Sequence, residues 1–152
     1  MTFSITPHKY QWAHPLVRRI GKPPYIVVHH SGSPPTTTVD DIHAWHLANG
    51  WAGIAYHAII YPSGKIVRGR PVWAMGAHTY AHNECLGICF IGNWDTPNYK
   101  MPLLQKLAGV WLVLRWRRIF SIPKAHVKKH KDMSLNHTSC PGANFPFSKV
   151  VT

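Results

Sequence analysis

The sequence contains very few acidic residues. Its 152 residues include only five carboxylate side chains, Asp40, Asp41, Glu84, Asp95 and Asp132. A glycoside hydrolase needs two carboxylates on either side of the bond that it cuts, and this set offers few suitable pairs. The shortage nearly excludes glycosidase chemistry.

Cysteine is scarce as well. Cys85, Cys89 and Cys140 cannot all pair with one another, and a secreted disulfide framework normally has an even, denser set. There is no Cys-x-x-Cys pair, so a closed structural zinc site is not expected. We interpret Cys85 and Cys89, inside an apolar run, as small buried hydrophobic residues.

Long apolar stretches are also missing. The longest run, LAGVWLVL at 107–114, lies between Lys106 and Arg115 and is far shorter than the ~20 residues that cross a bilayer. The first residues, MTFSITPHKYQW, lack a basic region followed by an apolar one. We therefore expect no transmembrane segment, no secretory signal and synthesis in the cytoplasm.

The composition otherwise indicates one folded domain with a strongly positive surface. Apolar residues make up 45% of the chain and aromatic residues 12%, which is enough to close a core at this length. Seventeen Lys and Arg against five acids give a net charge of +12, which favours a polyanionic partner. Nucleic acid and an anionic cell envelope both qualify, but no nucleic-acid-binding motif is present.

The first half of the chain predicts an arm followed by alternating elements. Residues 1–24 contain four prolines and no acid, which predicts an irregular basic arm wrapped on the domain formed by residues 25–152. YIVVHH at 25–30 predicts an interior strand that ends at the turn-forming SGSPP. Thr38 and Asp41 form a capping pattern, and Asn49-Gly50 a stop signal, for a helix over 39–49.

The second half predicts a sheet and one long helix. Residues 53–70 have the pattern of a hairpin around Pro62-Ser63-Gly64, which would put Tyr56 and His57 on its first strand. Apolar runs predict a central strand at 85–94 and the main core helix at 102–120. Residues 123–146 lack periodicity and are expected to be mostly loop.

Twelve histidines raise the question of a metal site. His29 ends the strand at 25–30, while His130 and Cys140 bracket the polar segment HKDMSLNHTSC. Two imidazoles and one thiolate, with a fourth position left for water, are typical of a catalytic zinc centre. The pattern makes His29, His130 and Cys140 candidate ligands.

Four segments together resemble one enzyme family. VVHHSGS, GWAGIAYHAIIYPSGKIVRGR, GAHTYAHNECLGICFIGN and HKDMSLNHTSCPG, in this order, are similar to the zinc N-acetylmuramoyl-L-alanine amidases related to peptidoglycan recognition proteins and T-odd phage lysozymes. The resemblance covers residues 25 to about 146. It implies peptidoglycan as substrate and Zn²⁺ as cofactor.

The resemblance also implies roles for individual residues. The zinc ligands would be His29, His130 and Cys140. Tyr56 would be catalytic, and Thr138 would help to polarise the scissile carbonyl. Further positions expected to contact substrate are His30, His78 and Trp51.

Several alternatives remain open at this point. The spacing between His130 and Cys140 is longer than in typical recognition proteins, which leaves His126 and His137 as other candidate ligands. Cys89 stands where wall-recycling relatives carry a Glu general base. His57 is interpreted as structural. A peptidoglycan-binding receptor without activity is the alternative function, although Cys140, which inactive receptors of the family usually lack, favours the enzyme.

The expected protein is a single-domain α/β enzyme with a central mixed sheet, flanking helices and a zinc cleft on one sheet face. It would hydrolyse the amide between the lactyl group of N-acetylmuramic acid and L-alanine of the stem peptide. We expect a monomeric phage or prophage endolysin that acts on the cell wall after release with the help of a holin.

Overall fold

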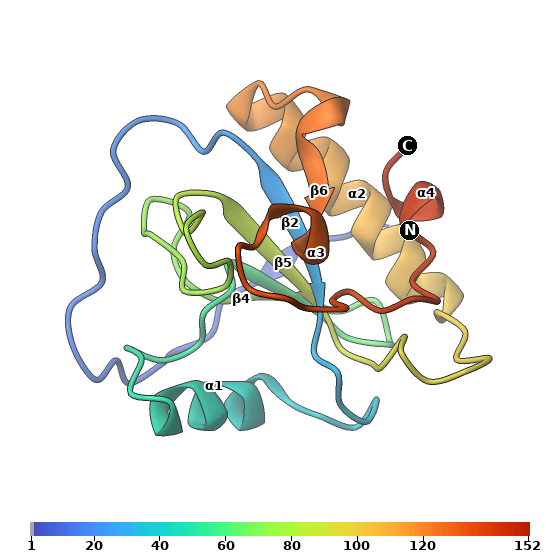
Figure 1. The fold of residues 1–152 in the computed structure, drawn as a ribbon, viewed down its shortest axis with the longest axis horizontal. Coiled ribbons are helices and arrows are strands. Elements are labelled where there is room, and N and C mark those ends of the chain that lie inside the picture. The colour runs from blue at the N-terminus through green and yellow to red at the C-terminus, as the bar shows by residue number, and fades with distance from the viewer. Residues whose placement is uncertain (1) are drawn as a thin grey trace.

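In a computed structural model of the chain, which describes residues 2–152, one mixed sheet forms the centre of the molecule (Figure 1). The strands lie in the order β1-β4-β3-β5-β2-β6. Only β3 and β4 pair antiparallel, and the other four pairings are parallel. The expected α/β fold with a central mixed sheet is confirmed. The strands are Ile5–Thr6 (β1), Ile26–His30 (β2), Ala58–Ile60 (β3), Ile66–Arg68 (β4), Leu86–Phe90 (β5) and Val127–Lys129 (β6).

Two main helices cover opposite faces of this sheet (Figure 1). Helix α1, Val39–Ala48, has the expected capping box between Thr38 and Asp41. Helix α2, Leu103–Phe120, ends at Ser121 in a left-handed conformation. The remaining helices are short: η1 at Lys124–His126, α3 at His130–Met133 and α4 at Phe147–Val150.

Each sheet face has its own core because side chains alternate along a strand. Val28, Ile88 and Phe90 pack with α2 in the larger cluster. Ile59 and Cys89 pack with α1 in the smaller one. The side chain of His29, which follows Val28 on β2, alternates onto the α1 side, where it reaches Tyr56 and Cys140.

Two expectations about secondary structure were wrong. The arm is not wholly irregular, because it contains strand β1, which pairs with β4. Residues 123–146 are mostly loop as expected, apart from η1, β6 and α3. Tyr56 and His57 come just before β3 rather than on it. The amides of Ile54 and Ala55, which precede them, donate to side chains of α1. The segment bonds to β5 only from the His57 amide onward, through the Gly87 carbonyl.

The arm wraps on the domain, as the wide blue loop at the left of Figure 1 shows. Arg19 of the arm is buried, and its guanidinium donates hydrogen bonds to the carbonyls of Val72, Ala74 and Glu84. Arg18 lies over the ring of Trp73. Arg19 therefore supports the fold and is not available to an external anion.

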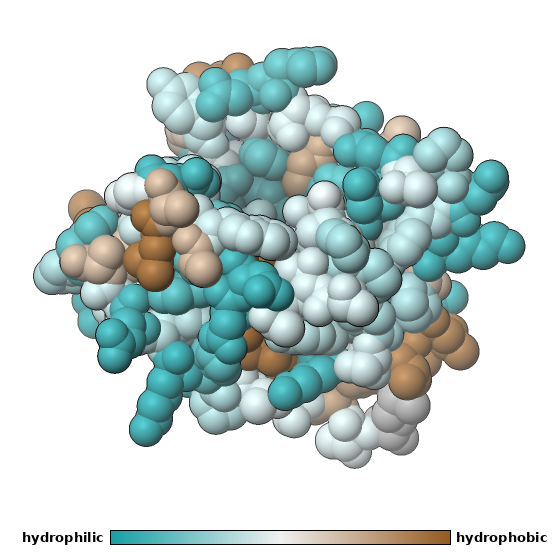
Figure 2. Space-filling model, turned by 90° about the horizontal axis from the view of Figure 1, so that it is seen from below, coloured by the Kyte–Doolittle hydropathy of each residue, from teal (hydrophilic) through white to brown (hydrophobic). Residues whose placement is uncertain are grey.

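The surface on the α1 side of the molecule is mostly hydrophilic. Figure 2 shows that side, with apolar atoms gathered in separate areas and not in one continuous patch. Within residues 2–152, no helix combines the length and apolar character needed to cross a membrane.

Candidate metal centre and substrate groove

Three potential ligand side chains meet at one edge of the sheet. His29 lies near the end of β2, and His130 follows the parallel neighbour β6, so the chain direction brings both to the same edge. Cys140 reaches them from the loop after α3. The ligand atoms of the three residues all lie within 4.8 Å of one another, and Cys140 Sγ is 3.7 Å from His29 Nδ1.

The surroundings keep both imidazoles neutral. Burial first, and then the neighbouring His78 and His130, lower the pKa of His29 well below 6.5. Burial, followed by His30, lowers the pKa of His130 to about 4. A neutral imidazole is the form that binds a metal.

The Cys140 thiol is buried beside them. Burial raises its pKa to about 12, while the hydrogen bond from the His30 amide, 3.4 Å from Sγ, acts in the opposite direction. Without a cation the group is therefore a thiol. A borderline-soft divalent ion replaces that proton, and two nitrogens with one sulfur suit zinc.

His78 fixes which nitrogen of His29 faces the cluster. Its Nε2 lies 3.1 Å from the carbonyl oxygen of Cys85, which can only accept, so this nitrogen donates. Its Nδ1 is then the acceptor, 3.0 Å from His29 Nε2 and 2.8 Å from the Thr79 hydroxyl, which itself lies 3.5 Å from His29 Nε2. His29 Nδ1 is left unprotonated on the side of Cys140. Gly87 makes room for this pair, since a Cβ there would lie 2.7 Å from His78 Cδ2.

Tyr56 lies against the same cluster. Its ring centroid is 5.1 Å from that of His29. Burial, followed by Cys89 and Cys140, raises its pKa well above 10, so the hydroxyl keeps its proton and can donate. The ring of Tyr56 therefore packs on one candidate ligand, and its protonated hydroxyl lies near the thiols of Cys89 and Cys140.

Two histidines of α1 hold the segment that carries Tyr56. His43 Nδ1 accepts from the Ile54 amide at 2.9 Å, and His46 Nδ1 accepts from the Ala55 amide at 3.0 Å. The two histidines are three residues apart and so lie on the same face of the helix. Gly53, at φ +140, allows His43 to approach, because a Cβ there would collide with its ring.

Arg70 also holds the segment that carries Tyr56. Its Nε donates to the Ile54 carbonyl at 2.8 Å, and its backbone amide donates to the Tyr56 carbonyl at 2.8 Å. The backbone around Tyr56 is thus fixed by contacts from residues far apart in the sequence.

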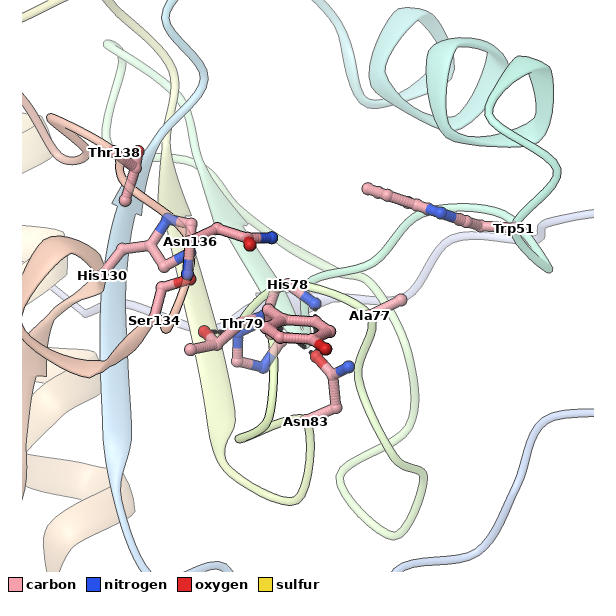
Figure 3. Close-up of a pocket in the computed structure, with 10 residues that line it drawn as sticks. Trp51, Ala77, His78, Thr79, Asn83, His130, Ser134, Asn136 and Thr138 are labelled. Atoms are coloured by element: carbon pink, nitrogen blue, oxygen red, sulfur yellow. Dashed lines mark hydrogen bonds between the residues drawn. The ribbon is translucent and has the colours of Figure 1, made fainter.

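A groove of about 320 Å³ opens beside the cluster. Figure 3 shows His130 and Thr138 on one side, Trp51 on the other, and His78 with Asn83 between them. Its lining is mostly polar and includes the aromatic rings of Trp51 and Tyr80, which suits a ligand with hydroxyl and amide groups. It is lined by Trp51, Ala77, His78, Thr79, Tyr80, Asn83, His130, Ser134, Asn136 and Thr138.

Most residues selected from the sequence come together here. His29, His130 and Cys140 form the cluster, Tyr56 contacts it, and the groove includes three others, namely Trp51, His78 and Thr138. Thr138 Oγ1 also accepts from the Cys140 amide at 3.2 Å.

The structure does not bring His30 to the groove. Its side chain lies on the opposite side of β2, where Nδ1 accepts from the Trp94 amide at 3.2 Å. His126 stacks on Tyr25 and His137 is exposed, so neither belongs to the cluster. His57 is buried between the Gly87 amide and the Ala74 carbonyl, which is a structural setting.

Sequence reasoning missed the residues that shape the groove from a distance. Asn83 Oδ1 accepts from the amides of His78 and Thr79 at 2.8 and 2.9 Å and so closes the turn that presents them. Asn is typical of such turns, which was the available signal. His46 and Arg70 gave no local signal because their partners are loop backbone groups.

Known proteins match this chain over most of its length. The family described as N-acetylmuramoyl-L-alanine amidase matches residues 19–143. The endolysin of Enterobacteria phage T3 is 32% identical over 110 residues, covering 66% of this chain and 72% of that protein. Peptidoglycan-recognition protein SC2 of Drosophila melanogaster is 35% identical over 129 residues, covering 79% of this chain and 68% of that protein.

A solved structure gives the same result. The N-acetylmuramoyl-L-alanine amidase LysC from Clostridium intestinale superposes with a TM-score of 0.89 at 34% identity, over 98% of this chain and 95% of that one. Together with the family match over residues 19–143, this shows that the chain belongs to the N-acetylmuramoyl-L-alanine amidase family.

Proposed function

We propose that this amidase is a zinc-dependent endolysin. It cuts the amide between the lactyl group of N-acetylmuramic acid and the L-alanine of the stem peptide in peptidoglycan. The observation that carries the proposal is the His29, His130 and Cys140 cluster with Tyr56 beside it, at the end of a groove. The endolysins of phages T3 and T7, at 32% and 31% identity, support the phage role.

The donor set defines what a metal would contribute. His29 Nδ1, His130 and Cys140 Sγ would hold zinc with one position left open. A zinc ion in this setting supplies Lewis acidity, polarising a carbonyl and making a water more acidic.

The chain's own hydroxyls then act on the substrate. The Tyr56 hydroxyl donates a hydrogen bond to the scissile carbonyl oxygen as negative charge develops there. Thr138, which lines the groove, offers a second hydroxyl. One preorganised donor of this kind contributes about 3 kcal/mol to transition-state stabilisation.

The groove positions the substrate for this chemistry. Trp51 and Tyr80 are exposed aromatic side chains that can pack on sugar or peptide surfaces, and Asn83 and Asn136 provide amide groups. His78 acts mainly through His29 and not by direct contact.

A receptor without activity is the competing function. The similarity to recognition protein SC2 is consistent with either, since its name states only recognition of peptidoglycan. The complete cluster of three ligands favours the enzyme, because binding a glycan-linked peptide does not require a buried thiol next to two neutral imidazoles.

The test is product analysis in heavy-oxygen water. Purified protein is incubated with peptidoglycan in H₂¹⁸O, and the products are examined by mass spectrometry before and after metal removal and zinc addition. We expect stem peptides with free L-alanine amino termini and one ¹⁸O in the lactyl carboxylate, lost on chelation and restored by zinc. Binding without such products would support the receptor instead. Release by a holin remains a prediction that concerns the infected cell.

A further inference from the structure

Helix α2 has an apolar outer face that the core does not explain. Its inner face is buried through Ala108, Leu112 and Trp116. Of the thirteen large hydrophobic side chains that are exposed within residues 2–152, five belong to this one helix. They are Leu103, Leu104, Leu107, Leu114 and Ile119, with exposed fractions between 38% and 61%.

Three of these side chains form a stripe together with one arginine. At 3.6 residues per turn, Leu103, Leu107, Leu114 and Arg118 fall within an arc of about 60°, whereas Leu104 and Ile119 lie outside it. Lys106 lies on one border of this arc and Arg115 on the other. The helix therefore presents Leu103, Leu107 and Leu114 outward between basic side chains.

The end of the stripe is a shallow depression with both apolar and basic walls. It is lined by Trp111, Leu114, Arg115, Arg118 and Ile119. The Arg115 guanidinium lies over the Trp111 ring, 5.4 Å from its centroid. Tryptophan and arginine beside leucine and isoleucine are typical of a surface that lies at the boundary between water and lipid.

The charge around this face has one sign. Residues 96–131 contain nine Lys and Arg and no acidic residue. Two copies of this face would repel each other, whereas a surface of anionic headgroups would be attracted to it.

We propose that the outer face of α2 binds the surface of an anionic phospholipid bilayer. Leu103, Leu107 and Leu114 enter the headgroup region, while Arg115 and Arg118 pair with lipid phosphates. The helix lies along the membrane, as basic amphipathic helices do, and does not cross it.

The position of α2 allows this contact without closing the groove. The helix covers the sheet face opposite to the one on which His29 and Cys89 lie. Membrane binding and hydrolysis are therefore separate properties, and the proposal does not depend on the amidase reaction.

The test uses the full chain and vesicles without peptidoglycan. Co-sedimentation is measured with phosphatidylglycerol-rich vesicles, with pure phosphatidylcholine vesicles and at rising salt. We expect binding only to the anionic vesicles, weakened by salt. Replacing Arg115 and Arg118 together by Gln should reduce affinity about 30-fold, and replacing Leu107 and Leu114 together by Ser about tenfold.

Matched controls use exposed side chains elsewhere. Val17→Ser with Ile20→Ser removes two apolar groups that are 67% and 98% exposed, and Lys65→Gln with Arg68→Gln removes two exposed charges. We expect these pairs to bind vesicles like the unchanged protein, and all variants to hydrolyse soluble fragments normally.

Three results would overturn the proposal. One is equal binding to phosphatidylcholine vesicles, and another is equal loss in the control pairs. The third is a concentration-dependent dimer that the α2 variants abolish, which would assign the face to a second copy of the chain.

Discussion

The two faces of the sheet bury different kinds of side chain. On the α2 side, aliphatic and aromatic groups such as Phe90, Trp94 and Leu112 make up most of the core, although Gln105 of α2 is buried there too. On the α1 side the apolar cluster is smaller, and buried histidines lie around it, namely His29, His43, His57 and His78. The boundary between the two runs through single strands, since Ile88 and Cys89 are neighbours on β5.

This difference indicates that one face of the sheet mainly stabilises the fold, while the other holds the groups suited to chemistry. Burying a polar group is costly unless it is hydrogen-bonded. The histidines of the α1 side meet that condition individually, as His57 does between Gly87 and Ala74. The α2 side supplies apolar burial that lets the other face hold groups suited to catalysis. Predictions that separate the two faces test this interpretation.

The largest effect is expected from Cys140→Ser. A neutral hydroxyl replaces the only anionic ligand of the proposed set, so zinc and hydrolysis should be lost together while the fold is retained. Zinc content, turnover and circular dichroism measure the three. Cys85→Ser is the control, because that buried thiol lies outside the cluster and should keep the metal. Full zinc and activity in the Cys140 variant would remove this residue from the site.

Tyr56→Phe should lower kcat by about 10²–10³-fold with little change in melting temperature. The ring and its packing on His29 stay, and only the hydroxyl is removed. Tyr61→Phe should instead lower the melting temperature and leave kcat unchanged. The Tyr61 hydroxyl accepts a hydrogen bond from the Val39 amide at the start of α1. Normal turnover in the Tyr56→Phe enzyme would show that Tyr56 only fills space.

On the other face, Leu112→Ala should destabilise the protein by about 3 kcal/mol, because Leu112 is fully buried and its loss leaves a cavity. Urea unfolding measures this. Leu114→Ala, two residues away on the exposed side of the same helix, should cost less than about 0.5 kcal/mol. Folded Leu112→Ala protein should keep its zinc affinity, and a marked loss would mean that the two faces are coupled.

His78→Leu should weaken zinc binding by about 10–100-fold, because His29 loses the partner that fixes its tautomer. Competition with a chelating dye measures the affinity. His78→Asn should recover part of it, since the amide oxygen can accept from His29 Nε2. Nitrogen NMR of His29 in the metal-free protein should show the tautomer shift in the Leu variant alone. Unchanged affinity in the Leu variant would reduce His78 to a packing role.

Sequence patterns were sufficient where structure is decided locally. The cap at Thr38, the apolar run of β2 and the hairpin around Gly64 each carried their own signal. The candidate ligands could be selected from their segments, since His29 and His130 stand near element ends and Cys140 lies in a recognisable polar loop.

The rest depends on contacts that are distant in sequence. Strand β6 has one buried residue, Val127, and two lysines, which an edge strand tolerates but a pattern does not reveal. Arg19 belongs to a basic arm by its sequence, yet Glu84, 65 residues away, is among its carbonyl partners. The hydrogen bonds from α1 to the Tyr56 segment could not be predicted from the sequence either. Their partners are backbone amides, which every residue except proline has.

A further effect concerns the acid stability of the metal-free protein. Burial lowers the pKa of His57 from 6.5 to about 3, so below pH 6.5 the unfolded chain binds a proton that the native state does not. The free energy of unfolding should therefore fall as pH decreases from 6.5 towards 3, by up to about 1.4 kcal/mol per pH unit for this group, and His57 should add no dependence above that range. His57→Asn keeps an acceptor for the Gly87 amide but cannot titrate. The free energy of unfolding, measured in urea with chelator, should therefore depend less steeply on pH in this variant, even if the variant is less stable at every pH. Parallel slopes in the two proteins would mean that His57 is protonated in the native state, and the α1 face would then tolerate charge that this structure excludes.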